Sequence, residues 1–247
     1  MSFLTIFFTL LFYFATLILV GGLAYRTWVY AKTPAPLKIV VTPAPMTKGG
    51  VVFRLWKEVI FFSSLFKANK WIWLFGWLFH FGLLLVLLRH LRYFTDPVWW
   101  WVSLVQPFGK YAAFAMVIGL GGLLARRFLV DRVRYISSPS DYLMLVLLLG
   151  IGGSGAFMTF VSGIDIISLK AFFLGLMRFN WQPFPASPVL IVHMLLVATL
   201  MIIFPISKLL HAPGMFFSPT RNQVDNPREK RHVVDWALKL ESSDNKS

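Results

Sequence analysis

Residues 71–94 read WIWLFGWLFHFGLLLVLLRHLRYF, an apolar run that contains two histidines, His80 and His90. A helix of about 20 apolar residues is long enough to cross a bilayer. Polar side chains inside such a span are costly and tend to be functional. The stretch therefore predicts a transmembrane helix whose two imidazoles have a specific purpose.

The whole chain is more apolar than an ordinary soluble domain. Of its 247 residues 57% are hydrophobic, and the mean hydropathy is +0.70. Continuous rather than alternating apolar runs predict helices and not a barrel; they cover residues 3–24, 71–91, 108–129, 141–163 and 188–211. We expect an all-α integral membrane bundle of five transmembrane helices over residues 1–211, followed by a polar cytoplasmic tail over 212–247. No Lys or Arg precedes Arg26, so we interpret the first run as an uncleaved span.

The net charge of +14 is unevenly distributed along the chain, and this distribution indicates the membrane topology. Most Lys and Arg residues fall in segments 25–70, 125–141 and 208–247, which lie on one side of a five-span protein. The positive-inside rule then places the N-terminus outside and the C-terminus in the cytoplasm. The basic excess therefore favours a multi-pass protein of the bacterial inner membrane over one that binds nucleic acid.

The chain contains no cysteine. Disulfides, covalently attached c-type haem and cysteine-ligated iron–sulfur clusters are excluded on this chain. If electrons pass through the protein, its iron–sulfur relay must belong to a partner.

Three further segments have a recognisable pattern. VVFRLWKEVIFFSSLF (51–66) has apolar residues at helical spacing and predicts an interfacial amphipathic helix. Two interpretations stay open: a helix that simply lies on the membrane, or a docking surface for a cytoplasmic subunit. Segment 164–185 is too interrupted to span and predicts a short piece on the outer surface. GIGGSG (150–155) lies inside a span with no preceding strand, so we interpret its small residues as helix packing and not as a dinucleotide motif.

The four membrane histidines occur only in the second and fifth spans. Because these spans run in opposite directions, His90 is level with His193 near the outer side, and His80 with His211 near the inner side. The spacings of ten and eighteen residues give about 15 and about 27 Å of helical rise. A bend at Pro205 would reduce that mismatch.

Two facing imidazoles in an apolar setting are the axial ligands that a planar haem needs. Bis-histidine ligation leaves no open position for oxygen, so the predicted chemistry is electron transfer through two haems. Cations flank both pairs and are candidates for the propionates or for ordinary interface residues: Arg89 and Arg92 outside, Arg126, Arg127 and Lys208 inside.

Two other functions would use the same residues differently. A transporter could place the histidines in a proton or metal path, although a metal site favours closely clustered ligands. A non-catalytic membrane anchor would not need them at all. His232, in the polar tail, is assigned no role.

The paired histidine spacings resemble those of the dihaem cytochrome b subunit, the gamma subunit, of respiratory nitrate reductase, over roughly residues 1–211. Within that superfamily, the text of residues 73–94 and the preceding TPAPLK…TPAP…GGVVFR segment look closest to the DsrM family. These are the cytochrome b subunits of the sulfite-reductase-associated transmembrane complex, DsrMKJOP. A gamma-type subunit of a nitrate-reductase-like complex is the alternative.

The resemblance implies two haems b, held by His80 with His211 and by His90 with His193. It also implies a menaquinone or ubiquinone site near the outer haem, where Lys110 matches a lysine of the nitrate enzyme. Arg89 stands where that enzyme has glycine, which favours a different partner. The implied partners are a cytoplasmic iron–sulfur subunit similar to heterodisulfide reductase (DsrK-like) and further membrane and periplasmic subunits. The chain would be the electron-transfer subunit of a quinone-linked oxidoreductase in dissimilatory sulfur metabolism.

Overall fold

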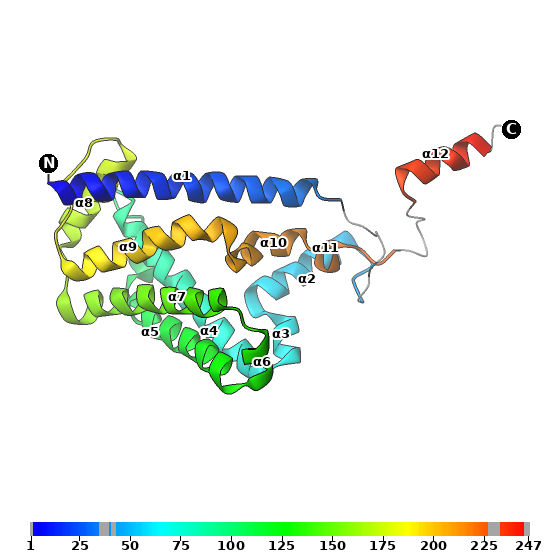
Figure 1. The fold of residues 1–247 in the computed structure, drawn as a ribbon, viewed down its shortest axis with the longest axis horizontal. Coiled ribbons are helices and arrows are strands. Elements are labelled where there is room, and N and C mark those ends of the chain that lie inside the picture. Colours follow the sequence, from blue (N-terminus) through cyan, green and yellow to red (C-terminus); the bar gives the residue numbers. More distant parts are fainter. Residues whose placement is uncertain (1, 35–39, 41–42, 227–232, 245–247) are drawn as a thin grey trace. The chain divides into compact units, whose positions relative to one another are not determined.

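The computed structural model describes residues 2–34, 40, 43–226 and 233–244. Within these ranges the regular structure is helical and contains no strand (Figure 1). Five helices are long and apolar enough to cross a membrane: Phe3–Lys32, Lys70–Tyr93, Trp100–Leu129, Pro139–Ser162 and Pro188–Ile206. The predicted all-α bundle of five transmembrane helices is confirmed. His232 and much of the proline-rich segment 33–50 lie outside the described residues.

The chain divides into two compact units. The first unit is Met1–Gly22 with Phe62–Ser207, and the second is Leu23–Phe61 with Lys208–Ser247. The boundary between the units divides α1 (Phe3–Lys32), and its first part belongs to the first unit. The other helices of the first unit are α3 (Ser63–Ala68), α4 (Lys70–His90), η1 (Leu91–Tyr93), α5 (Trp100–Leu129), α6 (Asp131–Ile136), α7 (Pro139–Phe157), the π-helical turn η2 (Met158–Ser162), α8 (Ile166–Met177), α9 (Pro188–Ile203) and η3 (Phe204–Ile206). Helices of the second unit, after the last part of α1, are α2 (Lys48–Phe61), η4 (Lys208–Leu210), α10 (His211–Phe217), α11 (Pro219–Asn222) and α12 (Asp235–Asp244).

Several predicted boundaries differ from the observed ones. The first helix continues past residue 24 to Lys32, and the third begins at Trp100 with Pro107 inside it. The fifth stops at Ile203, because Pro205 lacks the N–H that would continue the ladder and a short 3₁₀ turn follows. His211 is therefore not the end of a long fifth helix but the first residue of α10. Pro205, where a bend would reduce the mismatch of the histidine spacings, is thus the point at which the regular helix ends.

The spanning helices of the first unit pack in sequence order: α4 against α5, α5 against α7, and α7 against α9 (Figure 1). The connections from α4 to α5 and from α5 to α7 are short, whereas the one from α7 to α9 contains η2 and α8; each pair is antiparallel, as in an up-and-down bundle. Phe79, Met116, Leu120 and Leu148 form the buried core shared by α4, α5 and α7. This order places the histidines of α4 and α9 on helices that run in opposite directions.

Glycines allow α4 and α5 to touch through their backbones. A Cβ on Gly119 would lie 2.6 Å from the backbone nitrogen of Phe79, and one on Gly82 would lie 2.8 Å from that of Met116. Close approach of this kind is how helices associate in lipid, where apolar burial gives little driving force. Because Phe79 precedes His80, this contact also fixes the part of α4 that carries a candidate ligand.

We expect Gly119→Ala to lower the melting temperature of the detergent-solubilised protein, because backbone atoms of α4 must move to admit the methyl group. Overpacking of this kind costs about 1–3 kcal/mol. Gly121→Ala is the matched control, since a Cβ there meets nothing within 4 Å. Equal melting temperatures for the two variants would contradict the close packing of α4 on α5.

A second core joins the beginning of α1, helix α8 and α9. Phe8 and Phe172 are fully buried in it, and Phe8 stacks on Phe184 with 4.2 Å between ring centroids. Asp165 caps α8 by accepting hydrogen bonds from the backbone N–H groups of Ile167 and Ser168. The predicted short piece between spans four and five is thus a helix whose apolar side is packed in the core, and it ends at Met177, before the prolines.

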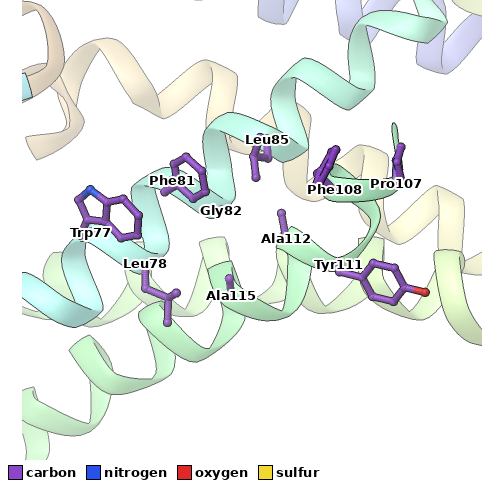
Figure 2. A pocket seen from close by; sticks show the side chains of 10 residues that line it. All are labelled: Trp77, Leu78, Phe81, Gly82, Leu85, Pro107, Phe108, Tyr111, Ala112 and Ala115. Atoms are coloured by element: carbon purple, nitrogen blue, oxygen red, sulfur yellow. The ribbon is translucent and has the colours of Figure 1, made fainter. Parts of the chain in front are cut away.

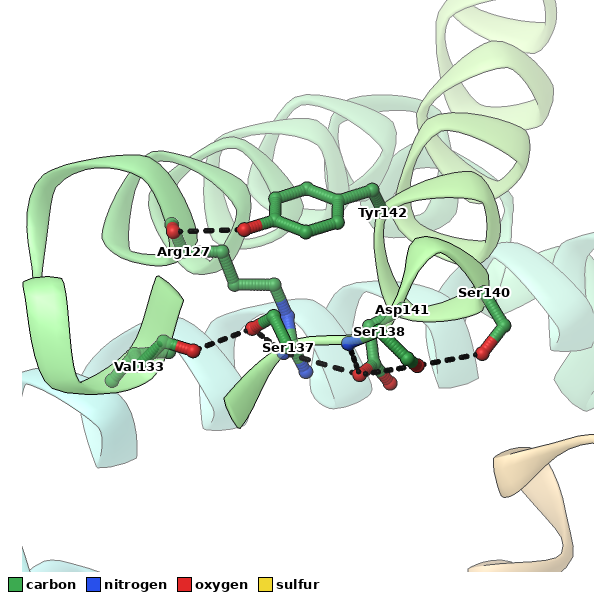
Figure 3. Close-up of polar contacts among 7 residues, drawn as sticks. All are labelled: Arg127, Val133, Ser137, Ser138, Ser140, Asp141 and Tyr142. Atoms are coloured by element: carbon green, nitrogen blue, oxygen red, sulfur yellow. Dashed lines mark hydrogen bonds and ion pairs between the residues drawn. The ribbon is translucent and has the colours of Figure 1, made fainter. Parts of the chain in front are cut away.

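A polar network holds the turn between α5 and α7 (Figure 3). Arg127 donates to the Ser137 hydroxyl at 2.7 Å and lies 3.6 Å from the buried Asp141 carboxylate. Asp141 also accepts from the backbone N–H of Ser138 at 3.0 Å, completing a capping box at the start of α7. Tyr142 donates to the Arg127 carbonyl at 3.1 Å. Arg127 therefore has a protein carboxylate as its partner, and its role is to fix this turn.

The second unit contains most of the predicted amphipathic helix. The structure divides that segment into α2 and α3 at Phe62, whose φ of 49° is left-handed and ends the first helix. The polar Glu58 is buried and pairs with Arg221 of α11 at 3.4 Å. The apolar side of α2 is exposed instead, at Val52, Phe53, Trp56 and Ile60. An outward apolar face is what a membrane-lying helix or a docking helix would present, so both interpretations stay open.

Candidate cofactor site

His90 and His193 form the candidate outer pair, and both belong to the first unit. His90 ends α4, and its Nδ1 lies 2.6 Å from the Val86 carbonyl oxygen. His193 is buried in α9, and its Nδ1 lies 2.8 Å from the hydroxyl oxygen of Ser154 in α7. These two histidines lie on α4 and α9, which run in opposite directions, and they are 103 positions apart in the sequence.

His80 and His211 form the candidate inner pair. The Nδ1 of His80 lies 2.7 Å from the Gly76 carbonyl, and its ring meets those of Phe62 and Phe79 edge-on at 5.0 and 4.6 Å. The Nδ1 of His211 lies 2.9 Å from the Lys208 carbonyl. His80 belongs to the first unit and His211 to the second, and their pairing stays a prediction.

The four histidines share one feature of direct chemical importance. Each directs Nδ1 at an oxygen, a backbone carbonyl in three cases and a hydroxyl in the fourth. A carbonyl oxygen only accepts, so Nδ1 carries the hydrogen and the lone pair is on Nε2. Tying one ring nitrogen in this way is how proteins prepare the other to bind a metal.

The donor set fits haem better than a bare metal ion. Among the described residues no group of three or more His, Cys, Asp or Glu side chains is placed to hold a metal ion. A haem brings four pyrrole nitrogens of its own and needs only two axial ligands from the protein. Isolated histidine pairs with Nε2 prepared for ligation are what that cofactor requires.

Cations gather at the end of α4 that carries His90. Arg89 donates to the Thr159 hydroxyl at 3.4 Å, and Arg92 donates to the Gln106 side-chain oxygen at 3.1 Å. Gln106 in turn donates to the Arg89 carbonyl at 3.2 Å. In the described part of the chain, neither arginine has an ion pair with a carboxylate. Their charges are therefore available to an anionic group such as a haem propionate.

Lys110 lies near the start of α5. Its Nζ is 5.2 Å from the Phe160 ring centroid and 5.8 Å from that of Tyr111. No carboxylate among the described residues forms an ion pair with it. Lys170 of α8 differs, because its Nζ donates to Asp96 at 2.8 Å. This hydrogen bond, together with the charge of Lys170, holds the pKa of Asp96 below its usual value. Lys110 is thus a cation without such a structural task.

An apolar groove lies between α4 and α5 (Figure 2). Its volume is about 540 Å³, and carbon atoms make up nearly all of its lining. Trp77 lies at one end, and Pro107 and Tyr111 lie at the other. Lys110 is not among the lining residues, but its neighbour in α5, Tyr111, is one of them.

Ser154, Thr159 and Gln106 were not singled out by the sequence analysis. Each is a polar residue in or beside an apolar span, and such residues tend to be functional, so this pattern could have identified them. Their partners, however, are on other helices or on a distant turn, and only the packing of α4, α5, α7 and α9 brings them within reach. GIGGSG was interpreted as helix packing, whereas its serine contacts His193.

The chain belongs to the nitrate reductase gamma subunit family, which matches it over residues 56–227. That region contains all four membrane histidines, and the family predicted from their spacing is confirmed.

Two curated relatives extend the similarity across 91% of this chain. A protein of Archaeoglobus fulgidus is 36% identical over 272 aligned residues, and 81% of its own length is covered. A protein of Archaeoglobus profundus is 31% identical over 274, with 80% covered. Each is described as the cytochrome b-like subunit of an Hdr-like menaquinol oxidoreductase.

Proposed function

We propose that this chain is a dihaem cytochrome b that transfers electrons between the membrane quinone pool and a cytoplasmic iron–sulfur partner. The observation that carries the proposal is the preparation of the histidines: His90 and His193 lie on spans that run in opposite directions, and each has its Nδ1 beside an oxygen, so that Nε2 is left for a metal. When bound, haem would supply reversible one-electron chemistry within the apolar bundle.

Each candidate residue has a task in this proposal. His90 and His193 hold the outer haem through Nε2, and His80 and His211 hold the inner one. Arg89 and Arg92 would neutralise propionates at the outer end, because they lie beside His90 and have no carboxylate partner among the described residues. Burial between apolar helices would exclude water from both haems.

Lys110 is the candidate quinone residue. A quinone joins a polar ring to a long apolar tail, and Tyr111, the residue after Lys110, lines the apolar groove between α4 and α5. Its ammonium would donate a hydrogen bond to a quinone oxygen, while the tail would lie along the groove or in the surrounding lipid. The names of both relatives, menaquinol oxidoreductase subunits, support menaquinone as the substrate.

The partner and the orientation belong to the same proposal. The relatives are described as Hdr-like, which supports a cytoplasmic iron–sulfur subunit resembling heterodisulfide reductase, of the DsrK type, in dissimilatory sulfur metabolism. With the N-terminus outside, quinol would be oxidised at the outer face and its protons released there. Electrons would then move inward through the two haems.

The decisive experiment is a pyridine haemochrome assay on the purified full-length chain, with haem counted per protein. We expect about two haems b per chain, both extractable by acidic acetone because no cysteine can bind them covalently. Folded protein without haem in freshly prepared membranes would overturn the proposal. A histidine-dependent metal or proton flux would then assign the four histidines to transport.

A further inference from the structure

The small-residue segment GIGGSG, residues 150–155 of α7, lies directly against the candidate haem ligand His193. Ser154 contacts the imidazole Nδ1 at 2.8 Å, from a different helix. The other three histidines direct Nδ1 at a backbone carbonyl three or four residues earlier in the chain. His193 differs from them, because a side chain on another helix, which can be replaced, contacts its Nδ1.

The direction of the hydrogen bonds follows from the surroundings of Ser154. Its hydroxyl donates to the Gly150 carbonyl at 2.6 Å, with the Ile151 carbonyl next at 3.1 Å. Since its single hydrogen is used there, the serine oxygen is left to accept from the Nδ1–H of His193. The result is a two-step chain from imidazole to hydroxyl to carbonyl, in which each hydrogen bond strengthens the other.

Gly155 provides the room for this contact. A Cβ at that position would lie 3.3 Å from Cε1 of His193 and 3.8 Å from Nδ1. The imidazole therefore rests on the backbone of α7 at Gly155, while Ser154 beside it fixes the ring's rotation. Together the two residues determine where Nε2 points.

We propose that Ser154 is a positioning residue that orients His193 and sets the reduction potential of the haem it binds. The inference rests on the proposed function, because it requires His193 to be a ligand. A hydrogen bond accepted from Nδ1–H raises the electron density on Nε2 and so favours ferric over ferrous iron. Removing the acceptor shifts the balance toward the reduced haem.

The test is a potentiometric titration of the purified full-length protein, followed by haem absorbance. In Ser154→Ala we expect one of the two haems to become easier to reduce, by up to about tenfold in its reduced-to-oxidised ratio at a fixed potential. That ratio corresponds to about 59 mV for a one-electron couple. Loss of about one haem per chain in this variant would equally support a positioning role.

Two variants serve as controls. Ser154→Thr keeps a hydroxyl and should retain both haems and the wild-type potentials. Thr199→Val removes a hydroxyl from the same helix as His193, where it donates to the Leu195 carbonyl and forms no hydrogen bond with a histidine of the described residues; it should change neither potential.

Two results would overturn the inference. If Ser154→Ala keeps both haems at unchanged potentials, Ser154 has no part in setting them. If Thr199→Val shifts a potential as much as Ser154→Ala does, the effect is one of general packing. A wild-type chain without haem would refute the proposed function and this inference together, and it is recognised before any variant is compared.

Discussion

Replacing His193 with alanine is expected to reduce the haem content from about two to about one per chain, and His90→Ala should give the same result. Each removes one axial ligand of the candidate outer haem, and a low-spin haem in an apolar bundle is not retained with its iron half ligated. The remaining haem should keep the spectrum of a bis-histidine cytochrome b. Haem per protein and the dithionite-reduced spectrum measure both effects.

Double variants test the pairing itself. If His90 and His193 hold the same haem, the variant that lacks both should still contain about one haem, because the second substitution removes a ligand from a site already empty. Removing His90 and His80 together should eliminate both haems. The opposite pattern, complete loss of haem from a folded His90 and His193 double variant, would show that these two histidines do not share a haem.

A matched control separates ligation from the general loss of an imidazole. His232 belongs to the polar tail and is assigned no role, so His232→Ala should keep both haems. Loss of haem in this variant would show that the assay reports protein instability. Size-exclusion profiles of all variants in detergent would identify misfolding.

The transmembrane architecture was predictable because hydrocarbon length and backbone satisfaction leave few alternatives to a helix. Helix ends were less predictable. Helix α5 already begins at Trp100, although Pro107 lies inside it. Helix α1 continues to Lys32, beyond the apolar run from which the first span was predicted. The end of α1 does have local signals, because Lys32 lies in its last turn and Pro34 follows two residues later. Hydropathy alone does not include these signals.

Some residues of the candidate site could likewise be predicted from the sequence, and others could not. His80, His90, His193 and His211 were found from the sequence because an imidazole in an apolar run is conspicuous. Ser154 was not, since a serine among glycines fits ordinary helix packing. Phe62 was also unpredictable: a bulky residue rarely adopts a left-handed backbone, yet here it ends α2 and places its ring against His80. The contact of Ser154 with His193 and that of Phe62 with His80 each join residues that are far apart in the sequence.

Replacing Lys110 with alanine is expected to slow the reduction of the haems by a menaquinol analogue by about tenfold to a hundredfold. This is the loss that follows when a charged donor of about 1.5–3 kcal/mol is removed from a bound oxygen. Haem content and reduction by dithionite should not change, because Lys110 lies beside the Tyr111 and Phe160 rings and pairs with no carboxylate among the described residues. Stopped-flow absorbance in the haem band measures the rate.

Lys170→Ala is the control for Lys110, because it removes the same charge from a lysine whose ammonium is already held by Asp96 at 2.8 Å. If quinol reactivity depended only on the net positive charge near the outer end of α4, both variants would slow the reaction equally. A selective effect at Lys110 would instead mean that the quinol ring contacts this lysine. Equal rates in wild type and Lys110→Ala would show that Lys110 does not bind the quinol. Arg89 and Arg92 would then be the cations to test, since both lie beside His90 and have no ion-paired carboxylate among the described residues.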